Sequence, residues 1–119
     1  MAASDIPRTL RVGEQIRREL AELLRDAVKD PRVAGVTLLD VRVSRDLAHA
    51  KVYYSTLEDE PRRLAEIQAG LEHAAGFLRG QLGRRMRIRT VPQLRFIYDD
   101  TEKKAAELEA LIRRALHKN

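Results

Sequence analysis

Apolar residues recur along this chain at two spacings, that of a helix and that of a strand, and the order of these segments restricts the folds that the chain can adopt. Apolar residues recur every three or four positions from about Arg8 to Lys29, which predicts an amphipathic helix that ends before Asp30-Pro31. A period of two then predicts strands at Leu39 to Val43 and at Ala50 to Tyr54. Because the intervening segment, Ser44 to Leu47, is short and polar, these strands are expected to form an antiparallel hairpin.

The period of a helix returns after Pro61 and continues to about Leu82, but glycine interrupts it at Gly76. Glycine inside a helix costs about 0.5–1 kcal/mol relative to alanine, so a bend or a close backbone approach is expected there, with two helices meeting at a kink. Gly83 is interpreted as the end of the second helix.

A third strand and a last helix complete the pattern. Leu94, Phe96 and Tyr98 alternate with Arg95 and Ile97, which predicts a strand, and Pro92 suits only the start of that strand. Thr101 is expected to cap the final helix. The apolar face of that helix comprises Ala105, Leu108, Leu111, Ile112 and Ala115. Phe77, Phe96 and Tyr98 are expected in the core rather than as platforms for base stacking.

The whole pattern predicts one α+β domain whose three-stranded sheet is packed by helices on one face, in the order helix, strand, strand, helix-kink-helix, strand, helix. A length of 119 residues fits a single hydrophobic core. The expected organisation is a flexible N-terminus over residues 1–7, the domain over residues 8–116 and a short end over residues 117–119.

The positive charge of the chain is concentrated in one segment. The 26 residues from His73 to Tyr98 contain six arginines and no lysine, aspartate or glutamate, while the rest of the chain has 17 basic and 18 acidic residues. An arginine block without acidic residues favours phosphate binding, because guanidinium groups match phosphate geometry. A solvated basic surface without a ligand is the simpler alternative, and composition does not separate the two.

The residues give little support for catalysis, and we expect no enzyme, cofactor or metal. The chain has no cysteine, and its three histidines are scattered without metal-ligand spacing. Ser44, Asp46 and His49 contain the residue types of a triad, but on a hairpin turn they are expected to bond the local backbone. Asp99 and Asp100 precede a helix and suit capping. No segment resembles a signal peptide or membrane span, so a cytoplasmic location is expected.

Several motifs in one order resemble the ribosome-binding factor A family over nearly the full length. They are RTLRVGEQIRRELAELL from Arg8, KDPR from Lys29, SRDLAHAKVYY from Ser44, AAGFLRGQLGRRMRIRTVP from Ala74 and LRFIYDD from Leu94. The resemblance implies a type II KH-like domain in which an alanine-x-glycine kink, here Ala74-Ala75-Gly76, replaces the usual G-x-x-G loop. Gly80-Gln81-Leu82-Gly83 also spells G-x-x-G, but Leu82 continues the apolar stripe, so the first register is favoured.

The resemblance further implies a non-catalytic factor that binds the small (30S) ribosomal subunit and its 16S rRNA during late maturation, assists rRNA processing and folding, and supports growth in the cold. We expect it to be a monomer when free. The expected phosphate contacts are, in order of preference, Arg79, Arg84, Arg85, Arg87 and Arg89; Arg45 and Lys51; and Arg8 and Arg11. An exposed strand edge is the alternative role for Arg87 and Arg89, and an ion pair with Asp46 or a neighbouring residue is the alternative for Arg45. A basic adaptor that binds an acidic protein is the competing function.

Overall fold

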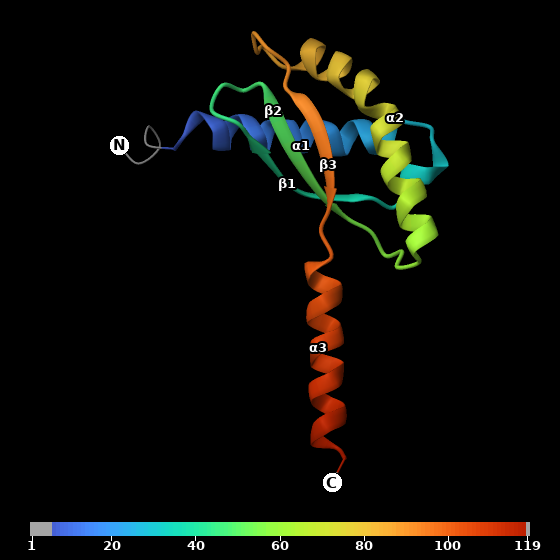
Figure 1. The fold of residues 1–119 in the computed structure, drawn as a ribbon. Coiled ribbons are helices and arrows are strands. Elements are labelled where there is room, and N and C mark those ends of the chain that lie inside the picture. The colour runs from blue at the N-terminus through green and yellow to red at the C-terminus, as the bar shows by residue number, and fades with distance from the viewer. Residues whose placement is uncertain (1–5, 119) are drawn as a thin grey trace.

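The computed structural model describes residues 6–118, so residues 1–5 of the predicted flexible N-terminus and Asn119 of the predicted short end lie outside it. Its elements confirm the α+β class and the predicted order (Figure 1). They are α1 (Arg8–Asp26), the 3₁₀ turn η2 (Pro31–Val33), β1 (Thr37–Val43), β2 (His49–Ser55), α2 (Pro61–Arg85), β3 (Gln93–Tyr98) and α3 (Thr101–Leu116).

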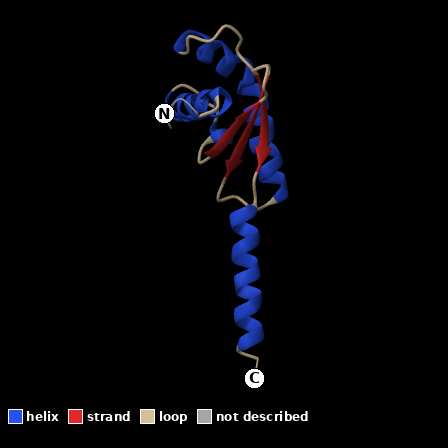
Figure 2. Ribbon diagram, turned by 90° about the vertical axis from the view of Figure 1, so that its left-hand side faces the viewer, coloured by secondary structure: helices blue, strands red, loops and turns tan. Residues whose placement is uncertain are grey.

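The three strands form one sheet in the order β1-β2-β3, with β1 antiparallel to β2 and β2 parallel to β3. The hairpin was therefore predicted correctly. One face of the sheet packs on α1, which crosses behind the strands in Figure 1, and on α2, which runs alongside β3. Figure 2 shows the same arrangement from the side. The core lies between these helices and the inward side chains of the strands, including Val41, Val52 and Phe96.

Helix α1 packs very closely on β1. Its predicted apolar face is buried, with Ile16 and Leu20 both 0% exposed. A Cβ placed on Gly13 would meet the carbonyl oxygen of Val41 at 2.5 Å, so only glycine permits this approach. The helix ends at Asp26, earlier than the predicted Lys29, and Asp30 instead accepts the backbone N–H of Arg32 at the start of η2.

A bulge in β1 changes which leucine enters the core. The register with β2 shifts between Leu38 and Asp40. Leu38 is therefore buried, and Leu39, which was predicted to alternate with Val41 on one face, is 42% exposed. The prediction for Leu39 is wrong because an extra residue in one strand reverses the direction of the side chains beyond it.

The predicted kinked pair of helices is one hydrogen-bonded helix, α2, whose axis bends partway along its length (Figures 1 and 2). Leu82 is fully buried, which confirms that it continues the apolar stripe. Gly83 does not end the helix, which continues to Arg85. A Cβ on Gly83 would lie 3.2 Å from the Val91 side chain, so this glycine accommodates the segment that follows the helix.

Helix α3 forms where it was predicted, but it projects away from the rest of the molecule (Figure 1). Asp99 rather than Thr101 provides the cap, because its carboxylate accepts the Thr101 backbone N–H at 2.9 Å. None of the residues described in this helix is buried. The predicted apolar face therefore covers no part of the described chain, with Leu108, Leu111 and Ile112 at least 50% exposed.

Candidate nucleic-acid interface

The basic segment and the hairpin turn lie together at one end of the sheet. Because β2 and β3 are parallel, the turn before β2 and the link before β3 are neighbours. The backbone N–H of Gln93 donates to the carbonyl oxygen of Ala48 at 2.8 Å and joins the two segments. In Figure 1 this end lies opposite α3. Arg45 therefore shares one rim of the domain with Arg84, Arg87 and Arg89, which are far from it in the sequence.

Four arginines on this rim remain available for a ligand. Arg84 lies in the last turn of α2, Arg87 and Arg89 lie in the link that follows, and Arg45 lies in the turn between β1 and β2. All four side chains are exposed, and none forms an ion pair within residues 6–118. We call these residues the arginine rim. Neither alternative role is seen in the described structure: Arg87 and Arg89 precede β3, and Arg45 forms no ion pair with Asp46 or any other residue among residues 6–118.

Arg79 is bound within the fold instead. Its Nε donates to the carbonyl oxygen of Pro92 and its Nη2 to that of Val91, both at 3.0 Å. These bonds attach the link to α2 and provide donors for two backbone carbonyl groups. The guanidinium was predicted as a first-choice phosphate contact, but its place in the structure is that of a clamp.

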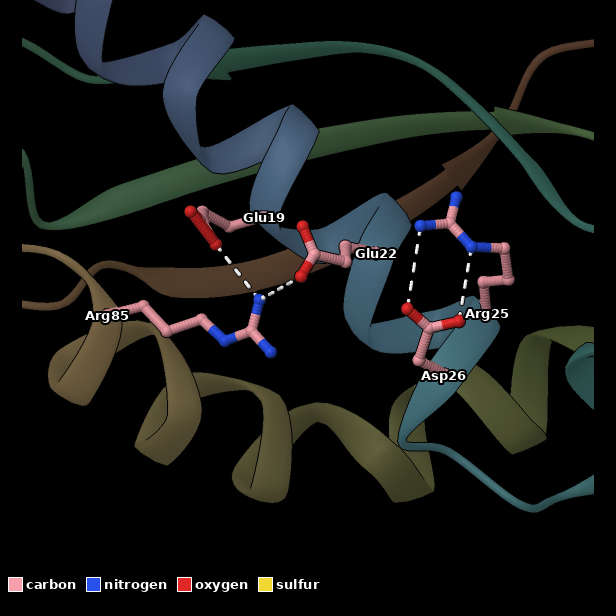
Figure 3. A network of polar contacts seen from close by, with 5 residues as sticks. All are labelled: Glu19, Glu22, Arg25, Asp26 and Arg85. Carbon is pink, nitrogen blue, oxygen red and sulfur yellow. Dashed lines mark hydrogen bonds and ion pairs between the residues drawn. The ribbon is translucent and has the colours of Figure 1, made fainter.

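Arg85 is also engaged with other residues of the chain, although its side chain is at the surface. One nitrogen, Nη1, lies 3.1 Å from Glu19 and 3.1 Å from Glu22, both on α1 (Figure 3). Hydrogen bonds from the guanidinium to Glu19 and then to Glu22 raise the pKa of Arg85 above its ordinary value. The two carboxylates pair with this arginine and connect α2 to α1, whereas its neighbour Arg84 has no ion pair within residues 6–118.

The lower-ranked basic residues occupy other surfaces. Lys51 is exposed and extends from β2 on the face of the sheet opposite the core. Arg8 and Arg11 lie in the first turn of α1, where both are exposed. Helix α1 begins beside the end of β1, since Gly13 contacts Val41, so these two arginines flank the end of the sheet that carries the rim.

The Ser44, Asp46 and His49 group forms a turn, as predicted. The Asp46 carboxylate accepts the Ser44 hydroxyl at 2.7 Å and the Ala48 backbone N–H at 3.1 Å. These bonds, led by that of Ser44, hold the pKa of Asp46 below its ordinary value. The Ser44 Oγ in turn accepts the backbone N–H of His49 at 3.0 Å. The hydroxyl and carboxylate therefore stabilise the left-handed Leu47 position, whose φ is 61°.

The kink motif presents an open helix surface. Ala74 is buried, Ala75 is partly buried and Gly76 is exposed. Cβ atoms added at Gly76 or Gly80 would meet no atom within 4 Å, so no close contact within the described chain explains either glycine. Phe77 lies on the same exposed side and is 48% exposed, so its predicted core position is wrong. The apolar stripe of α2 passes through Ala74 and Leu78, which are both buried, and Phe77 lies off that stripe.

Two further findings concern metal binding and membrane-spanning helices in the described residues. Within residues 6–118, no three histidine, aspartate or glutamate side chains gather as a metal cluster would. None of the helices in this part of the chain has the length and apolar character required to cross a bilayer.

The fold and the rim define a small α+β protein of the KH-like class with a basic end. Comparison with known proteins specifies the family. The family model for ribosome-binding factor A matches residues 8–112. The chain is 61% identical over 112 residues to ribosome-binding factor A of Thioalkalivibrio sulfidiphilus, covering 94% of this chain and 86% of that protein. This chain belongs to the ribosome-binding factor A family.

Solved structures agree with this assignment. The crystal structure of ribosome-binding factor A from Thermus thermophilus superimposes with a TM-score of 0.68 at 31% identity and covers 76% of this chain and 93% of its own. A homology model of the Thermus thermophilus factor, fitted into a cryo-EM map of its complex with the 30S subunit, gives a TM-score of 0.61 at 32% identity. That comparison covers 74% of this chain and 91% of the other.

Proposed function

We propose that this protein binds the small ribosomal subunit through its 16S rRNA during late maturation, and that it assists rRNA processing and folding without catalysis. The arginine rim is the observation that carries the proposal. Its four exposed guanidinium groups have no carboxylate partner within residues 6–118. Unpaired arginines at one end of a compact domain are suited to binding phosphates, because no internal pair must first be broken.

The relatives support the same partner. A Thermus thermophilus member was fitted into a 30S complex, and its structure resembles this chain over most of its length. We infer that Arg84, Arg87, Arg89 and Arg45 hold rRNA phosphates, with Arg8 and Arg11 adding charge at the flank. Arg79 and Arg85 support this surface through their bonds to the link and to α1. The protein acts as a placeholder that holds an rRNA intermediate until the mature arrangement displaces it.

The open side of α2 extends this surface. Gly76 and Gly80 leave the helix without side chains there, Phe77 lies between them in the sequence, and Arg84 follows them. A nucleic-acid backbone can approach such a helix more closely than one covered by longer side chains. In this proposal the kink motif Ala74-Ala75-Gly76 allows the RNA backbone to approach α2 closely, while the rim binds the RNA phosphates.

The proposal includes a cytoplasmic monomer that supports growth in the cold.

The competing function is an adaptor in which the rim binds an acidic protein. RNA binding releases counterions from each neutralised phosphate, so affinity falls log-linearly with salt at a slope of roughly 0.9 for each phosphate on duplex RNA, by analogy with DNA.

The test is co-sedimentation of the purified protein with small subunits, large subunits and assembled ribosomes over a salt series. We expect salt-sensitive binding to small subunits that is weaker on assembled ribosomes. Absence from small subunits at low salt would contradict the proposal. Binding that survives deproteinisation of the particle to bare 16S rRNA favours RNA over an acidic protein, and binding lost on deproteinisation favours the adaptor.

A further inference from the structure

The face of the sheet opposite α1 and α2 is uncovered within the described residues and carries three cationic side chains and an aromatic ring. Alternation places one set of side chains in the core with α1 and α2 and the other set toward solvent. In Figure 1 this outer face is turned toward the viewer, in front of α1. We call it the open sheet face. Its residues are Asp40, Arg42, His49, Lys51, Tyr53, Gln93, Arg95 and Ile97.

Three cations stand in one row across this face. Arg42 of β1 is directly opposite Lys51 of β2, which is directly opposite Arg95 of β3. All three are exposed. Arg42 has a carboxylate partner, Asp40, at 3.1 Å, but neither Lys51 nor Arg95 has one within residues 6–118. Like charges directly opposite one another destabilise a sheet, so the stability of the fold does not account for this row.

The adjacent row contains an aromatic ring beside the cations. Tyr53 lies at the centre of the sheet, opposite Asp40 on one side and Ile97 on the other. Its ring is partly exposed, and the guanidinium carbon of Arg42 lies 5.7 Å from the ring centroid. An accessible aromatic ring beside unpaired cations is the arrangement with which proteins bind single-stranded nucleic acid, since bases stack on the ring and phosphates contact the cations.

We propose that the open sheet face binds single-stranded RNA, with a base stacked on Tyr53 and the flanking phosphates held by Lys51 and Arg95. The inference rests on the proposed RNA-binding function, but it uses a surface separate from the arginine rim and assigns it a different ligand. A paired strand cannot place a base on Tyr53 without first unstacking it. The arginine rim thus binds RNA phosphates, and the open sheet face binds a segment with unpaired bases.

The test is fluorescence anisotropy of a labelled, unstructured RNA 10-mer and of a labelled RNA duplex. Tyr53→Leu removes the ring, and Tyr53→Phe keeps it. We expect Tyr53→Leu to weaken binding of the single strand roughly tenfold, Tyr53→Phe to bind nearly as the parent does, and duplex binding to be little changed. Lys51→Ala with Arg95→Ala is expected to weaken single-strand binding and to flatten its salt dependence by about two phosphates.

Circular dichroism melting verifies that each variant is folded, and the two alanine replacements at exposed sites provide a test even if Tyr53→Leu does not fold. Equal losses for single strand and duplex, or no loss for either, would overturn the proposal. Displacement of the 10-mer by poly-glutamate at equal charge concentration would also overturn it, because an acidic peptide would then fit equally well.

Arg84→Ala distinguishes the two proposals: if it weakens small-subunit binding while the open-face variants change nothing, the proposed function stands and this inference fails.

Discussion

Arg85 of α2 reaches Glu19 of α1 at 3.1 Å, while Arg84, the preceding residue, is exposed with no ion pair in the described structure. Two adjacent arginines in one helical turn therefore have different tasks. Since successive residues of a helix point about 100° apart, one faces α1 and the other faces away. The formal charge of the basic segment thus overstates the charge available to a ligand.

This pair of residues allows a matched test of the rim. Arg84→Ala and Arg85→Ala remove the same formal charge. We expect Arg84→Ala to weaken small-subunit binding and reduce its salt slope by about one, with the melting temperature unchanged. Arg85→Ala is expected to lower the melting temperature, since it leaves Glu19 and Glu22 without their partner, and to affect binding less. Equal effects of both variants on binding would indicate that only net charge matters.

At Lys51, one substitution is expected to raise the stability of the protein and to weaken its binding to RNA. Lys51→Glu would place a carboxylate between Arg42 and Arg95. Opposite charges across strands contribute roughly 0.2–1 kcal/mol for each pair, so urea unfolding should show a more stable protein. Single-stranded RNA binding should fall at the same time. A destabilised Lys51→Glu protein would show that the row of cations is not repulsive in the fold.

The glycines give a second matched pair. Gly76→Ala meets no neighbour and removes a flexible residue from a helix, so we expect it to stabilise the protein by about 0.5–1 kcal/mol. Gly13→Ala forces a methyl group against the Val41 carbonyl and is expected to destabilise it strongly. Thermal melting compares the two. The proposed role of Gly76 in admitting RNA predicts that Gly76→Val weakens small-subunit binding although the protein remains folded.

Tyr54 makes the stability of the core depend on pH in the alkaline range. Burial, followed by the charge of Glu72, raises the pKa of Tyr54 to about 12 from 10.0, and its hydroxyl donates to Gln68. Because the folded state holds this proton more tightly, the stabilisation is complete below pH 10 and is lost as the pH rises toward 12. Urea unfolding at successive pH values should show this loss, and Tyr54→Phe should remove that component. An unchanged pH dependence in Tyr54→Phe would contradict the assignment.

Helix α3 should be dispensable for the stability of the domain. No residue described in it is buried, and its links to the rest of the chain lie in its first turn, where Lys103 donates to the Glu58 carbonyl and lies 5.1 Å from the centroid of the Tyr98 ring. Truncation after Asp100 is therefore expected to leave the melting temperature within a few degrees of the parent. A large drop would mean that the apolar face of α3 contacts the domain in solution.

Local patterns in the sequence predicted the elements, because each buries one face at its own period, as Ile16 and Leu20 do in α1 and Val52 in β2. What the patterns missed depends on contacts between distant segments. The bulge that exposes Leu39 is set by pairing with β2, and the exposure of Phe77 follows from which side of α2 faces the sheet.

The same limit applies to the candidate site. The acid-free arginine block was evident in the sequence, but nothing in it distinguished Arg84 from Arg79 and Arg85. Those distinctions need the position of the Pro92 carbonyl and of Glu19. The open sheet face was missed for a similar reason, since Arg42, Lys51 and Arg95 are separated in the chain and meet only through the register of three strands.

Directed hydroxyl-radical probing tests the central claim, that the arginine rim faces 16S rRNA, most directly. The chain has no cysteine, so a single introduced cysteine carries the iron chelate at one known place. Thr90→Cys places it in the link that carries Arg87 and Arg89, and Ala115→Cys places it near the far end of α3; both positions are exposed. We predict strong, clustered 16S rRNA cleavage from position 90 on small subunits, and weaker or displaced cleavage from position 115. Strong cleavage from position 115 with none from position 90 would contradict the account.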